Sequence, residues 1–108
     1  MISEKYSILS QKIISKGYTL KDLGIYEYAW KKSDIVDILQ VLKEKKIAVL
    51  GGDVYRLDSG KVYGTYDSWF INDDGSNEFI EKSLEKVMRY INDYERMNGT
   101  NFVYAIVF

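Results

Sequence analysis

Carboxylates and aromatic rings are concentrated in residues 48–72, AVLGGDVYRLDSGKVYGTYDSWFIN. Two carboxylates that flank a sugar can serve as acid and base in glycoside hydrolysis, and Asp53 with Asp67 is the best candidate for such a pair. Histidine-activated serine or cysteine nucleophiles are excluded, because the chain contains no histidine and no cysteine. This inventory favours a surface that binds a partner over a site that transforms a substrate.

Metal and phosphate motifs are weak in this chain. Residues 73–75, followed by Glu78, resemble part of a calcium loop, but with Gly75 at the sixth position the first ligand would be Phe70. The glycine pair at residues 51–52 lacks the further glycines and the lysine of a phosphate-binding loop. We therefore predict no metal ion and no cofactor.

Charge is distributed unevenly along the chain, although the formal net charge is only -1. Residues 1–50 carry nine basic and six acidic side chains, whereas residues 51–108 carry six basic and ten acidic ones. This balance gives no general argument for a nucleic acid or an anionic membrane as partner. The acidic half favours a basic partner, and ordinary solvated surface charge is the alternative.

The start of the chain, residues 1–5, lacks the basic and apolar regions of a secretory signal. The longest apolar run, residues 102–108, is too short to span a membrane. The absence of cysteine is compatible with a reducing compartment. We expect a cytoplasmic protein with a single domain over residues 1–108.

Apolar residues that recur at helical spacing predict three helices. The first includes Ile2 and ends near Gly17, and the second begins with Ser33 as its N-cap. The third covers about residues 77–97 and ends at the Asn-Gly pair that follows.

Strands are expected at residues 47–50, 53–57, 61–71 and 102–108. The hairpin loop between the second and third is expected to use three residues, 58–60, with Gly60 in the left-handed conformation. The last strand is apolar throughout, so it should be buried on both faces. These elements predict an α+β fold in which an antiparallel sheet of about four strands, a meander plus the C-terminal strand, has helices packed on it.

One face of the predicted hairpin combines aromatic rings with carboxylates. If Leu57 pairs with Lys61, alternation places Asp53, Tyr55, Tyr63, Asp67 and Trp69 on the same face. Rings can anchor a protein partner while carboxylates meet its basic groups. Core packing of the rings is the alternative, and a bulge at the glycine pair would shift the register and exchange the faces. With the loop that follows, the candidate binding residues are Asp53, Tyr55, Tyr63, Asp67, Trp69, Asp73 and Asp74.

Several blocks of this sequence occur together in a known family. Ala29-Trp30 before a helix, LGGDVY at residues 50–55, TYDSWF at residues 65–70, a long helix and an apolar closing strand resemble a group of small bacterial immunity proteins. These proteins accompany polymorphic toxins, including contact-dependent growth-inhibition systems. The resemblance covers about residues 24–108, and Ser68 is a small departure from it, since asparagine is more usual there.

The resemblance implies a non-enzymatic protein without a cofactor that binds its cognate toxin in the cytoplasm and blocks it. It does not say which residues contact the toxin. An acidic, aromatic surface can occupy the basic cleft of a nuclease, so we expect a nuclease toxin inhibited at its active site or beside it. The partner is then the C-terminal domain of a toxin rather than a nucleic acid or a membrane, and the chain is either a monomer or a homodimer.

Two other functions remain open at this stage. A regulatory module could bind a small molecule or a peptide on the tyrosine-rich hairpin face. An enzyme could use the carboxylates and tyrosines, in which case Asp53→Asn or Asp67→Asn would abolish activity without unfolding the protein.

Overall fold

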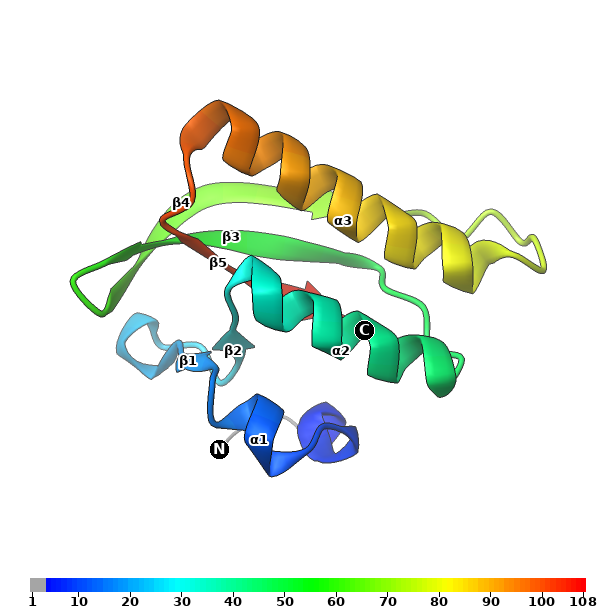
Figure 1. Cartoon of the computed structure of the whole chain (residues 1–108), viewed down its shortest axis with the longest axis horizontal. Helices are drawn as coiled ribbons and strands as arrows, with labels where there is room; N and C mark the ends of the chain where they lie inside the picture. The colour runs from blue at the N-terminus through cyan, green and yellow to red at the C-terminus, as the bar shows by residue number, and fades with distance from the viewer. Residues whose placement is uncertain (1–3) are drawn as a thin grey trace.

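The computed structural model describes residues 4–108, so the predicted contribution of Ile2 lies outside the described residues. Within that range, three antiparallel strands form a sheet in the order β4-β3-β5 (Figure 1). Their bounds are Gly51–Asp58 for β3, Lys61–Phe70 for β4 and Phe102–Val107 for β5. A smaller antiparallel pair consists of β1, Tyr18–Thr19, and β2, Tyr28–Ala29. The predicted α+β class and the helices packed on the sheet are confirmed.

The sheet contains three strands rather than about four, because residues 47–50 do not form one. The backbone of this segment finds partners elsewhere. Ile47 N–H donates to the carbonyl of Leu42 at the end of a helix, and Val49 N–H donates to Ser83 Oγ. Leu50 alone continues the ladder, by donating to the Val107 carbonyl.

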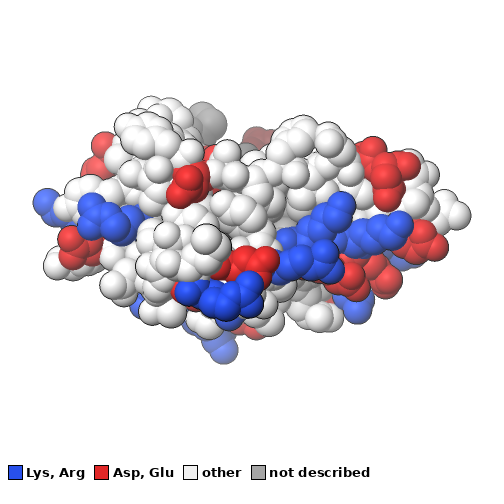
Figure 2. Space-filling view, turned by 90° about the horizontal axis from the view of Figure 1, so that it is seen from above, with Lys and Arg blue, Asp and Glu red and all other residues white. Residues whose placement is uncertain are grey.

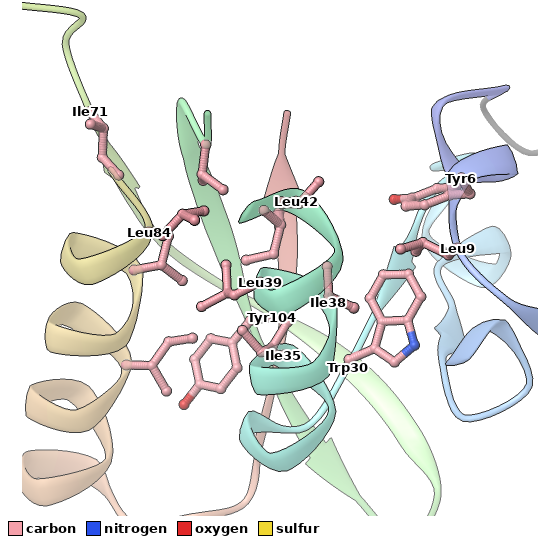
Figure 3. Close-up of a cluster of buried hydrophobic side chains, with 14 of the residues drawn as sticks. Tyr6, Leu9, Trp30, Ile35, Ile38, Leu39, Leu42, Ile71, Leu84 and Tyr104 are labelled. Carbon is pink, nitrogen blue, oxygen red and sulfur yellow. The ribbon is translucent and has the colours of Figure 1, made fainter. Parts of the chain in front are cut away.

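Two long helices lie side by side on one face of the sheet (Figures 1 and 3). They are α2, Lys32–Glu44, and α3, Phe79–Asn98. The shared core contains side chains from both helices and from the sheet, among them Ile35, Ile38, Leu42, Leu84, Val87, Ile91, Val54, Tyr104 and Ile106. The predicted third helix is therefore confirmed. The second helix begins earlier than predicted, because Lys31 rather than Ser33 is its N-cap residue.

The N-terminal segment contains two short helices instead of the single helix that its periodicity predicts. They are the 3-10 helix η1, Glu4–Ile8, and α1, Gln11–Ile14. Ser10 separates them, since its side chain accepts a hydrogen bond from Ile13 N–H and caps α1. Tyr6 is buried against Trp30, so the apolar residues still reach the core although the helix is broken.

The second face of the sheet is only partly covered. The segment from β1 to β2, which includes the 3-10 helix η2, Lys21–Leu23, packs against it. The buried cluster beneath this cover comprises Leu20, Ala29, Tyr55, Val103 and Ala105. Residues 103–106 of β5 are accordingly buried on both faces, as predicted, whereas its last residue, Val107, is exposed. Beyond the cover, Leu50, Phe70 and Val107 are exposed, which leaves this end of the face bare.

The hairpin register differs by one residue from the predicted one. Asp58 pairs with Lys61, so the loop contains only residues 59–60, both with positive φ, at 51° and 80°. Such a two-residue turn matches the right-handed twist of the flanking strands. Leu57 consequently pairs with Val62 instead of Lys61.

This shift exchanges the faces of β4, because side chains alternate along a strand. Asp53 and Tyr55 lie on the partly covered face, whereas Tyr63, Asp67 and Trp69 lie on the face that carries α3. The prediction of a single acidic and aromatic face was therefore wrong. The tyrosine-rich face that the regulatory-module alternative requires is divided in the same way.

Candidate protein-interaction surface

A large bulge interrupts β4 at residues 65–67. Asp53 pairs with Ser68, and Tyr55 pairs with Gly64, so three residues of β4 lie opposite the single residue Val54. The Thr65 hydroxyl fills the gap by donating to the Val54 carbonyl at 2.7 Å and by accepting from Asp67 N–H at 3.0 Å. The bulge is thus held by side-chain hydrogen bonds in place of the ladder.

The central residue of the bulge is strained and fully accessible. Tyr66 has φ of 66°, and its relative exposure is 101%. The left-handed conformation costs a residue other than glycine about 1–2 kcal/mol, and a large ring left in water gains nothing from burial. Strain of this kind concentrates at functional sites. The observation therefore points to a role for Tyr66 outside the folding of the chain.

A second exposed ring lies near the end of the same strand. Phe70 has a relative exposure of 79%, and it pairs with Gly51 on the partly covered face of the sheet. The carboxylates of Asp53 and Asp67 are also exposed in this region. We call Asp53, Tyr66, Asp67 and Phe70 the bulge surface.

Sequence reasoning selected only the two carboxylates of the bulge surface. Regular alternation through the predicted register places Tyr66 and Phe70 on the opposite face of the hairpin from the five residues named above, so neither was selected. The sequence trace of the bulge is slight. The only sign of it in the sequence is a threonine two residues before an aspartate. This spacing lets the Thr65 hydroxyl accept a hydrogen bond from Asp67 N–H.

The other candidate residues lie elsewhere or behind this surface. Tyr55 is buried, with 8% of its surface exposed. Tyr63 lies on the α3 face beneath the Arg56 guanidinium, 4.6 Å from ring centroid to Cζ. Asp73 and Asp74 lie in the loop before α3, where they accept backbone N–H groups two residues ahead, and the Asp74 carboxylate lies 3.6 Å from Lys82 Nζ. These hydrogen bonds stabilise the loop, and those that Asp74 accepts from Ser76 hold the pKa of Asp74 below its ordinary value.

Trp69 fixes the end of β4 against the helix layer. Its ring stacks on Tyr90 of α3 with 4.5 Å between centroids. It also lies over Gly52, where an added Cβ would be 2.3 Å from the indole. At Gly51 an added Cβ would be 2.4 Å from the Trp69 carbonyl. The glycine pair thus permits a close approach of β4 to β3, and these motif residues maintain the fold.

A row of tyrosines continues from Trp69 along α3. Tyr90 stacks on Tyr94, whose hydroxyl donates to Asp67 Oδ2 at 2.7 Å. The hydroxyl of Tyr104 donates to Glu95 at 2.8 Å. The Tyr94 contact places the Asp67 carboxylate at the edge between the bulge and α3.

These tyrosines predict a loss of stability in alkali. Desolvation, followed by the hydrogen bond to Asp67, raises the pKa of Tyr94 to about 12, and burial raises the pKa of Tyr6 and Tyr104 in the same direction. In the unfolded chain these hydroxyls titrate at about pH 10. Their contribution to the unfolding free energy is therefore complete below about pH 10 and is lost as the pH rises through the folded-state values. Urea unfolding measured above about pH 10 should show the unfolding free energy falling as the pH rises. The substitution Tyr104→Phe should make this fall with pH less steep. A slope unchanged by that substitution would contradict the assignment.

Charges of both signs are interspersed on the side of the molecule seen in Figure 2, with uncharged residues between them. Within residues 4–108, no group of three or more potential metal ligands comes together. No helix in the same range has the length and apolarity needed to cross a membrane. What distinguishes the bulge surface is its exposed rings, Tyr66 and Phe70, both carried by β4. Exposed aromatic rings are typical of a protein-binding site.

A comparison with known protein families identifies the class of this protein, and that class is one of binding proteins. The sequence profile of the family described as Immunity protein 40 matches residues 19–108. The chain belongs to this family of immunity proteins from bacterial polymorphic toxin systems, which confirms the resemblance seen in the sequence. Immunity proteins are non-enzymatic inhibitors that neutralise a cognate toxin. No curated protein and no solved structure matches the chain.

Proposed function

We propose that this immunity protein neutralises its toxin by direct one-to-one binding through the bulge surface. The observation that carries the proposal is Tyr66, a fully exposed ring held in a strained backbone conformation. Tyrosine is enriched among the residues that dominate binding energy, because a large ring is immobilised at a small entropic cost. Phe70 adds a second ring on the same strand.

The toxin is a nuclease in this proposal, and the protein covers its active site or the surface beside it. Asp53 of β3, on the partly covered face of the sheet, and Asp67 of β4, at the edge beside α3, both carry exposed carboxylates. Carboxylates can stand where substrate phosphates bind in a basic cleft, while the rings anchor the contact. A standard interface buries on the order of 800 Å² per partner. The encounter takes place in the cytoplasm of the producing cell, where the nucleic acids to be protected are found.

The test is growth of cells that express the toxin domain encoded next to this gene, with and without this chain. We expect rescue of growth, co-purification of the two proteins, and loss of both when Asp53→Lys and Asp67→Lys are combined. The matched control combines Asp37→Lys with Glu44→Lys, which introduces the same change of charge on the exposed side of α2. Full protection by the Asp53 and Asp67 variant would contradict binding at the bulge surface. Rescue without co-purification would contradict direct binding.

A further inference from the structure

A pocket of about 390 Å³ opens beside Tyr66 on the partly covered face of the sheet. Leu23 and Ile25, from the segment between β1 and β2, form one wall, and Tyr66 and Ser68 of β4 contribute another. Tyr55 lies among the lining residues from β3. The pocket therefore adjoins the bulge surface and is framed by two separate parts of the fold.

Gly64 lines this pocket and has no evident role in the folded structure. Its φ is not positive, so its backbone conformation does not require glycine. An added Cβ would meet no heavy atom of residues 4–108 within 4 Å. This contrasts with Gly51 and Gly52, where a Cβ would collide with Trp69. A glycine within a strand is destabilising, because it orders a flexible backbone and packs no side chain. We therefore attribute the glycine at residue 64 to the space that it leaves open in the pocket.

The lining of the pocket has one sign of charge. The lining residues include Asp53 and Asp67, and no basic residue of the described chain contributes. The Asp67 carboxylate is bonded to Tyr94 on the α3 side, so Asp53 supplies the carboxylate on the pocket's own face of the sheet. Its apolar residues and the Tyr66 ring suit the aliphatic stem of a long basic side chain. A guanidinium group can in addition stack on a tyrosine ring and pair with a carboxylate in the plane of its fork.

We propose that this pocket receives an arginine side chain of the toxin, held by the Asp53 carboxylate and the Tyr66 ring. This inference rests on the proposed function, because it specifies what the bulge surface recognises. Gly64 then determines access: the absence of its side chain admits the arginine, and any larger residue at this position excludes it.

A graded substitution of Gly64 tests the pocket. The probe is the purified toxin domain encoded next to this gene, and its dissociation constant is measured by calorimetry. Gly64→Leu should weaken binding at least about tenfold, and Gly64→Ala should weaken it less. Neither variant should unfold at a lower urea concentration, since the Cβ enters open space. Undiminished binding by Gly64→Leu would overturn the inference, and so would a loss of stability in both variants, because it would assign Gly64 a role in packing.

A double-mutant cycle identifies the occupant. Each arginine of the toxin is replaced by alanine, and binding is measured against the wild-type chain and against Asp53→Asn. For one arginine the two substitutions should be strongly non-additive, because each removes the same contact. Asp58→Asn, which lies near the hairpin turn on the same strand as Asp53, is the control and should couple to none of them. Coupling of Asp53 to no arginine would overturn the assignment.

These outcomes separate the inference from the function on which it rests. If the wild-type chain does not bind the toxin domain, the proposed function fails and the inference fails with it. If the wild-type chain and Gly64→Leu bind equally well, the proposed function stands and the pocket is excluded as the recognition site.

Discussion

Gly52→Ala is expected to destabilise the protein by about 2–3 kcal/mol. The new Cβ would lie 2.3 Å from the Trp69 ring and 2.7 Å from the Ala105 carbonyl. The indole has little freedom to move, because it stacks on Tyr90 with 4.5 Å between ring centroids. The strands would have to separate or the ring would have to leave its stack. Urea unfolding followed by circular dichroism measures the loss.

Gly64→Ala is the matched control for this effect on stability. It introduces the same methyl group into the same sheet, but into open space, and should stabilise the fold by about 0.5–1 kcal/mol. A second comparison places Gly52→Ala in a Trp69→Leu background, where the smaller side chain should reduce the loss. A loss of the same size in both backgrounds would show that the indole is not the obstacle.

Tyr66→Gly is expected to weaken toxin binding by about 2 kcal/mol or more, which is roughly thirtyfold. The same substitution should leave stability unchanged or raise it by up to about 1 kcal/mol, because glycine adopts the left-handed conformation without strain. Effects of opposite sign are the signature of a residue retained for binding. Calorimetric titration of the toxin domain and urea unfolding measure the two quantities on the same sample.

Two further variants make the Tyr66 result specific. Tyr66→Phe keeps the ring and should weaken binding less than Tyr66→Gly. Val36→Ala shortens another exposed apolar side chain, on the exposed side of α2, and should leave binding unchanged. A Tyr66→Gly protein that binds as tightly as the wild type would exclude the ring as an anchor, and one that is strongly destabilised would assign it a role in folding.

The elements that the sequence predicted well are those with long and regular patterns. Helix α3 has an uninterrupted apolar stripe and a glycine at its end, and β5 is apolar over its whole length. Helix α2 was also expected, although its start was placed too late. The prediction of a single N-terminal helix was wrong for a local reason. The Ser10 hydroxyl caps a new helix, α1, and so divides the segment in two.

The candidate site depended on a finer feature, the register of one hairpin. A loop of two residues instead of three moved Tyr63, Asp67 and Trp69 to the other face of the sheet. The composition Asp-Ser-Gly permits either loop, so the sequence alone could not determine the register. The bulge that exposes Tyr66 depends in turn on a hydrogen bond between the Thr65 hydroxyl and the Val54 carbonyl, which brings together residues from two strands.

The family motifs illustrate why resemblance identified the class and not the binding residues. Gly51, Gly52 and Trp69 belong to the blocks that carried the resemblance, and all three act in the close packing of β4 against β3 and α3. This packing role in the present chain does not depend on which toxin the protein binds. Tyr66 lies within the same block, but its side chain contributes nothing visible to that packing, since it is fully exposed.

Amide hydrogen exchange of this chain, alone and with its toxin domain, tests whether the toxin binds through the bulge surface. We expect the toxin to slow exchange in residues 51–54 and 64–70, around the bulge, while the exposed side of α2 exchanges as before. Protection confined to α2 and α3, with β4 unchanged, would contradict binding through the bulge surface.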